Sequence, residues 1–177
     1  MAVTDTFAGT IRTFLNLTRT RVEDERTEVQ TVNPTTTHTL VDGGANVAGA
    51  DLVWSDTRSL TGGTTETLDL LSLPETNFGV AATGVMRSVR AVRVVNNMAI
   101  TGPRIVVGPG PTNGWDRVAG DVGPGGELLA VQDRNHWPVG DGSRNLLIHA
   151  TGPTGATGAI SYTITIVGSG VTGATGY

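Results

Sequence analysis

The chain has 177 residues, of which 38% are hydrophobic and 16% are charged, and its formal net charge is -4. This length suits one domain with a single core, and the acidic balance excludes the phosphate backbone of a nucleic acid as the main partner, since such binding needs clustered positive charge. The chain has no cysteine, no secretory leader and no apolar run near the ~20 residues of a membrane helix, so we expect a protein that folds in a reducing cytoplasm without a membrane partner.

Residues 1–39 differ in composition from the rest of the chain. Phe7 and Phe14 are the aromatic residues of this stretch, and the segment 19–28 carries seven charges in ten positions. A mixed charge run of this kind is usually solvated. We therefore predict an extended arm that packs across the domain or reaches a neighbouring molecule, with Phe7, Phe14, Arg21 and Arg26 as candidate contact residues.

From residue 40 onwards, short apolar segments alternate with turns rich in glycine and proline, which is typical of β structure. In the clearest case, Ile160, Tyr162, Ile164 and Ile166 alternate with polar residues, which predicts a strand over 160–167 with one buried face. The segment 85–95 is apolar at both alternating sets of positions and predicts a central strand. Further strands are expected at 51–55, 66–73, 100–107, 127–131 and 145–149.

These patterns predict an all-β protein with a single β-sandwich of the jelly-roll kind over 40–170, an extended N-terminal arm over 1–39 and a flexible tail over 171–177. Two long connections, 108–126 and 132–144, carry Trp115 and Trp137. Tryptophan in an exposed loop is a candidate contact residue. The alternative is that each ring folds back onto the edge of the sandwich.

Two glycine patterns invite a ligand interpretation that their surroundings do not support. Residues 168–173 match the dinucleotide-binding pattern, but such a site needs a helix at this point and an acidic residue further along the chain. The glycine triplets at 152–158 and 170–176 are too few for a collagen helix. We expect a loop at the first triplet segment and a flexible tail at the second.

The remaining polar residues predict no catalytic residue, no metal site and no cofactor. His38, His136 and His149 lack the spacing of metal ligands. The loops at 133–135 and 141–143 offer oxygen ligands but do not continue into a calcium-binding loop. Nothing matches a serine-hydrolase nucleophile elbow, and paired carboxylates stay an open alternative because their pairing is spatial. We therefore predict that the protein is not an enzyme.

A set of turn and strand motifs between residues 39 and 170 is similar to that of one class of proteins. These motifs are 42–46, 50–60, 66–70, 89–92, 123–129 and 160–168. Together they resemble small structural proteins of tailed bacteriophages, most of all head decoration (cement) proteins. The resemblance implies a non-enzymatic virion protein, made in the host bacterial cytoplasm and placed on the capsid surface, where it bridges neighbouring capsid subunits. Its implied partners are the major capsid protein and further copies of itself, with no nucleic acid, membrane or cofactor.

We expect a trimer rather than a dimer, because icosahedral shells have many local three-fold axes, although closed symmetry in general favours dimers. One alternative is a tail or head-fibre component, in which the same fold would serve as an adhesive tip. A less favoured alternative is a carbohydrate-binding module, which would present a concave aromatic platform with nearby carboxylates.

Overall fold

The computed structural model describes residues 9–14, 17–23, 26–32, 35–40, 49–77, 80–99, 102–132, 135–152 and 159–174, and every regular element in these ranges is a β-strand. A ribbon is formed by β1 (Gly9–Phe14), β2 (Leu17–Glu23), β3 (Arg26–Val32) and β4 (Thr35–Leu40). The body is formed by β5 (Leu52–Thr61), β6 (Thr65–Asp69), β7 (Leu73–Asn77), β8 (Val80–Asn96), β9 (Ile105–Pro109), β10 (Gly120–Val122), β11 (Glu127–Val131), β12 (Trp137–Pro138), β13 (Asn145–Ala150) and β14 (Ala159–Ala174). The prediction of an all-β protein is confirmed for the described residues.

The body contains two sheets whose strands pair in a nested order. The four-stranded sheet has the order β10-β9-β13-β6, and the six-stranded sheet has the path β11-β8-β14-β5, with β7 and β12 also paired to β8. Along the chain, β5 pairs with β14, β6 with β13, β8 with β11 and β9 with β10, all antiparallel. Each of these pairs therefore encloses the next one in sequence, and the two ends of the body lie side by side in one sheet.

One hydrophobic core contains residues from both sheets. Ile160, Ile164 and Ile166 of β14 are buried, and Leu146 and Ile148 of β13 join the same cluster from the four-stranded sheet. Burying an isoleucine or leucine side chain stabilises a fold by roughly 1.5–3 kcal/mol, so the two-residue alternation decides which face of each strand joins the core. The predicted buried face of 160–167 is confirmed.

β8 is the central strand of the six-stranded sheet, as its apolar character on both faces predicts. It pairs with β14 along one edge and with β7, β12 and β11 along the other. Val92 and Val94 belong to the core, and Ala91, which precedes Val92 and lies on the other face of the strand, is also buried. The buried Arg90 donates from Nε to the carbonyl oxygen of Gly49 at 3.3 Å, so its charge lies beside backbone dipoles.

Several strand boundaries differ from those predicted. The strand expected at 66–73 ends at Asp69, because the Asp69 carboxylate accepts a hydrogen bond from the Leu71 amide at 2.9 Å and turns the chain before β7. The strand expected at 51–55 runs on to Thr61, and the one expected at 100–107 begins only at Ile105.

The end of the body also differs from the prediction. β14 continues to Ala174, so the flexible tail predicted over 171–177 is wrong for 171–174, where the chain pairs with β8. Residues 175–177 lie outside the described residues, as does most of the loop predicted at 152–158.

Gly168 and Gly170 explain how β14 can lie so close to β8. The register of the ladder shifts beside each of them. A Cβ atom at Gly168 would overlap the carbonyl oxygen of Ser88, and one at Gly170 would overlap that of Val85. The glycine pattern at 168–173 therefore serves the close approach of two backbones at irregularities of the sheet, not the binding of a phosphate.

Gly168→Ala should lower the free energy of unfolding by roughly 2 to 3 kcal/mol, because a methyl group there forces the two backbones apart. Gly108→Ala in β9 is the matched control, since no atom lies within 4 Å of the place of its Cβ. We expect the control to stay within about 0.5 kcal/mol of the wild type in urea unfolding followed by tryptophan fluorescence. Equal stability of the two variants would contradict the close approach.

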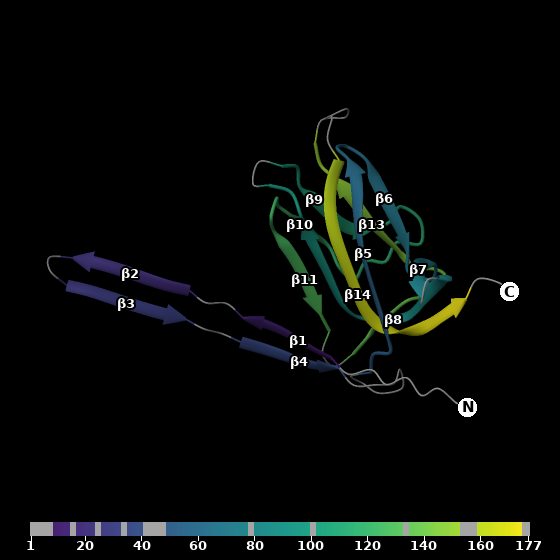
Figure 1. The fold of residues 1–177 in the computed structure, drawn as a ribbon, viewed down its shortest axis with the longest axis horizontal. Helices are drawn as coiled ribbons and strands as arrows, with labels where there is room; N and C mark the ends of the chain where they lie inside the picture. Colours follow the sequence, from purple (N-terminus) through teal and green to yellow (C-terminus); the bar gives the residue numbers. More distant parts are fainter. Residues whose placement is uncertain are drawn as a thin grey trace.

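The ribbon consists of two antiparallel pairs that follow one another along the chain. β1 pairs with β4, β2 pairs with β3, and neither pair belongs to a sheet of the body. Figure 1 shows the ribbon extending away from the body, with β2 and β3 at its far end. The register places Arg21 opposite Glu28 and Glu23 opposite Arg26. Because opposite charges at facing positions favour strand pairing, the charge run forms strands where an extended solvated segment was predicted.

Candidate functional site

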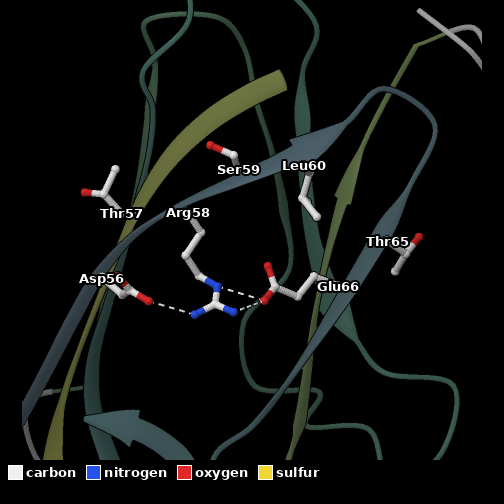
Figure 2. A pocket seen from close by; sticks show the side chains of 7 residues that line it. All are labelled: Asp56, Thr57, Arg58, Ser59, Leu60, Thr65 and Glu66. Atoms are coloured by element: carbon white, nitrogen blue, oxygen red, sulfur yellow. Dashed lines mark hydrogen bonds and ion pairs between the residues drawn. The ribbon is translucent and has the colours of Figure 1, made fainter. Parts of the chain in front are cut away.

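An open hollow of about 420 Å³ lies where the edge strand of one sheet meets the edge strand of the other (Figure 2). β5 and β6 supply its lining, which consists of Asp56, Thr57, Arg58, Ser59, Leu60, Thr65 and Glu66. Because β5 and β6 are joined by a tight turn, residues close in sequence reach this hollow from two different sheets. The hollow is therefore the candidate site for a ligand on the body.

Arg58 is the centre of the polar cluster in this hollow. Its Nε donates to Glu66 Oε1 at 2.7 Å, Nη2 donates to the same oxygen, and Nη1 donates to Asp56 Oδ2 at 2.7 Å (Figure 2). The hydrogen bond with Glu66 raises the pKa of Arg58 further above its ordinary value, against the opposing effect of burial. The guanidinium is thus a permanent cation held between two carboxylates.

Tyr162 of β14 fixes the other oxygen of Glu66. Its ring is fully buried, and its hydroxyl donates to Glu66 Oε2 at 2.7 Å. Burial, and then the hydrogen bond to Glu66, raise the pKa of the phenol well above its ordinary value. The tyrosine therefore stays neutral, and both oxygens of Glu66 have a donor.

This arrangement holds the sheets together and does not suit proton transfer. A general acid or base needs a proton position that can change near neutral pH, whereas the shifts of Arg58 and Tyr162 move both groups away from that range. Tyr162 has no exposed surface through which a substrate could reach its hydroxyl. Arg58 and Glu66 instead join the edge strands of the two sheets by a partly buried ion pair.

The cluster gives a prediction for alkaline stability. A group whose pKa is raised in the fold contributes stability below its unfolded pKa, about 10 for tyrosine, and loses it as the pH rises further. Above about pH 10 the free energy of unfolding should fall by up to about 1.4 kcal/mol per pH unit from Tyr162 alone. Tyr162→Phe should remove this slope in urea unfolding at several pH values.

Tyr177→Phe, which removes the other tyrosine of the chain, is the control for this experiment. In that background, tyrosinate absorbance reports Tyr162 only, and we expect it to appear together with unfolding. Ionisation of the folded protein near the ordinary tyrosine pKa would contradict the bonded and buried geometry.

The two loop tryptophans lie against the body. Trp115 is 0% exposed, and its Nε1 donates to the carbonyl oxygen of Pro138 at 3.2 Å. Trp137 is half-buried and meets Trp115 edge to face, with ring centroids 5.8 Å apart. The prediction of Trp115 as an exposed contact residue is therefore wrong, because its indole fills the core. Trp137 keeps an exposed part and stays a candidate.

Three of the four contact residues predicted in the arm lie in the ribbon. Phe14 ends β1 opposite Thr35, Arg21 lies in β2 and Arg26 begins β3. Phe7 lies outside the described residues. Arg21 and Arg26 lie on the paired strands β2 and β3, which form the far end of the ribbon, whereas β1, which ends at Phe14, lies nearer the body (Figure 1). Their role as contacts stays a prediction.

The histidines and acidic loops were the other residues weighed for ligand chemistry. His149 Nδ1 lies 3.0 Å from the hydroxyl of Thr65, His38 is half-buried in β4, and His136 is exposed. Among the described residues, no group of three or more histidine, aspartate or glutamate side chains is placed to hold a metal ion. Asp141 lies near Arg144 instead, at 3.7 Å.

Sequence analysis missed the cluster around Arg58, although a signal for it exists. Trp54, Asp56 and Arg58 occupy alternate positions of β5, on the side of the strand that faces the core. Charged residues on the core-facing side of a strand need partners of opposite charge. Glu66, on the core-facing side of β6, is such a partner for Arg58. The cluster was not predicted because the strand was expected to end at residue 55, whereas β5 continues to Thr61.

Comparison with protein-family models, with curated proteins and with solved structures finds no match for this chain. The part of the chain that the structure describes contains no helix long and apolar enough to cross a membrane.

Proposed function

We propose that this chain is a non-enzymatic structural protein of a tailed-bacteriophage virion, which decorates the capsid and stabilises it by bridging neighbouring capsid subunits. The observation that carries the proposal is the ribbon, which extends from the body and belongs to neither of its sheets. A two-stranded ribbon is at best marginally stable alone in water. We therefore expect another molecule to cover the ribbon and stabilise it.

We further propose that the body is a jelly roll. The support is the nested pairing, in which the first of eight main strands pairs with the last, the second with the seventh, the third with the sixth and the fourth with the fifth. Such an order arises when one long antiparallel hairpin wraps into two facing sheets, and viral capsid domains use this architecture. The resulting body is a rigid carrier for the ribbon.

The dimensions of the ribbon suit a bridging role. Each side of it contains two successive strands of six or seven residues, and a strand advances ~3.4 Å per residue. The ribbon therefore reaches roughly 45 Å, more than the ~20 Å length of a typical strand in a domain. Moderate contacts of this kind add up when many copies bind a symmetric shell.

The proposed partners are the major capsid protein and further copies of this chain, in a trimer on the capsid surface. Trp137 and the ribbon residues Phe14, Arg21 and Arg26 are the proposed contacts. The polar cluster around Arg58 agrees with a structural role, since its groups are bonded to one another and hold the sheets together. No residue is proposed as catalytic.

Purified full-length protein should bind undecorated capsids saturably, with a stoichiometry that matches the capsid lattice. Removing β2 and β3 should weaken this binding by about tenfold or more, which corresponds to about 1.4 kcal/mol. Thr67→Ala on the exposed outer face of β6 is the control and should bind as the wild type does. Sedimentation of capsids with labelled protein measures both quantities.

Absence of binding, or equal binding without the far part of the ribbon, would contradict the proposal. The number of copies in a purified particle separates capsid decoration from the alternative role. A copy number that matches the tail or a single vertex would assign the chain to a tail or head fibre.

A further inference from the structure

The outer face of β5 and β14 is an uncharged band. These strands pair over ten positions, and every second position points away from the core. The band consists of Val53, Ser55, Thr57 and Ser59 of β5 with Ser161, Thr163, Thr165 and Val167 of β14. The neighbouring strand β8 carries a charged residue, Arg93, which lies beside Thr165 and forms an ion pair with Glu127 at 3.0 Å. Free surfaces of soluble domains usually carry interspersed charges, so this band has the composition of a covered face.

Four of the six hydroxyls of the band are already bonded to one another. The hydroxyls of Ser55 and Thr165 lie 2.9 Å apart, and those of Thr57 and Thr163 lie 3.0 Å apart. Removing water from paired hydroxyls leaves fewer unsatisfied polar groups than removing it from hydroxyls bonded only to water. Val53, which is 41% exposed, adds apolar surface at one end. A second protein surface can therefore cover the band at low desolvation cost.

The far end of the ribbon has one uncharged face as well. In the β2–β3 register, Arg19, Arg21 and Glu23 occupy alternate positions of β2, and Arg26 and Glu28 face them from β3. Alternate positions of a strand lie on the same face, so the charged positions share one face of the ribbon. The other face carries the positions of Thr18, Thr20, Val22, Thr27, Val29 and Thr31. This set of threonine and valine has the same chemistry as the band.

The band and the ribbon also match in size. Each is two antiparallel strands wide, or about 10 Å when neighbouring strands and their side chains are counted at ~4.8 Å per strand. At ~3.4 Å per residue, the ten paired positions of the band extend about 34 Å and the seven of β2–β3 about 24 Å. The ribbon therefore fits within the band when one is laid on the other as two packed sheets.

We propose that the uncharged face of β2–β3 from one copy packs on the β5–β14 band of a second copy. This inference deepens the proposed function and takes from it that the chain self-associates. The occupant is a second copy because the far end of the ribbon lies well away from β5 and β14 of its own chain (Figure 1). Each copy then gives a ribbon and receives one, and a head-to-tail contact of this kind forms a ring such as the proposed trimer where the rotation between copies closes.

Cross-linking between copies tests this placement, because the chain has no cysteine of its own. Thr20→Cys, on the uncharged ribbon face, is mixed with Thr57→Cys, in the band, and treated with a short bis-maleimide cross-linker. We expect a covalent heterodimer on a denaturing gel. Gln30→Cys, on the charged face of the same ribbon, and Thr67→Cys, on the outer face of the other sheet, are the matched controls and should cross-link at least about tenfold less.

A charge in the band tests the energetics. Thr57→Glu should raise the dissociation constant of the full-length oligomer by about tenfold or more in analytical ultracentrifugation, since it buries a carboxylate against an uncharged face. Thr67→Glu should leave the oligomer unchanged. An oligomer that survives Thr57→Glu, or equal cross-linking through Gln30→Cys, would overturn the inference.

The outcomes separate this inference from the proposed function. A wild-type chain that is monomeric alone but binds capsids would overturn the second-copy occupant and leave capsid decoration standing. A ring that cross-links as expected but does not bind capsids would support the ribbon-on-band contact and overturn capsid decoration.

Discussion

The pairing of β14 with β5 on one side and with β8 on the other is the constraint on which the rest of the body depends. It joins residues far apart in the chain, such as Ser55 and Thr165, which are separated by 110 positions. The strands between them in sequence are enclosed by this pair, and the pairs β6–β13, β8–β11 and β9–β10 nest inside it. The register also decides the core, because a shift of one residue would turn Ile164 and Ile166 outward. Contacts of such long range bring a large loop-closure entropy, which favours slow folding.

Closure of two sheets leaves polar groups at their edges, and the body bonds these groups internally. At one edge Arg58 and Glu66 connect β5 to β6. At the end of β8, the buried Asn96 donates from Nδ2 to the carbonyl oxygens of Pro103 and Val122 at 2.9 and 3.1 Å, and so holds one loop and the end of β10 to β8. A buried polar group without a partner destabilises a fold, whereas these groups fix the relative positions of segments. The chemistry of the polar residues in the body thus serves its architecture.

Alternation of apolar residues predicts the middle of the body well, because the period of two follows directly from burial on one face. Strands β11, β13 and the first half of β14 lie where the pattern places them. The pattern does not carry the extension of β5 beyond residue 55, since Asp56 and Arg58 interrupt the apolar row and find partners only in the folded protein. The burial of Trp115 is equally a product of tertiary packing. Local sequence also cannot distinguish glycines that allow close backbone approach from those of a flexible tail.

Strand pairing changes the structural role of the charged segment 19–28. As a single strand, 19–28 is a solvated polar piece, but in the β2–β3 register its opposite charges lie at facing positions and its charged residues share one face. Arg21 and Arg26, which are proposed contacts with the capsid protein, occupy positions on that face. The opposite face carries no charge, and burying it against another uncharged sheet face requires no desolvation of an ion. The segregation of charge on the ribbon therefore separates a charged face, suited to a charged partner, from an uncharged face, and the uncharged band on the body supplies a surface of the same chemistry as the latter.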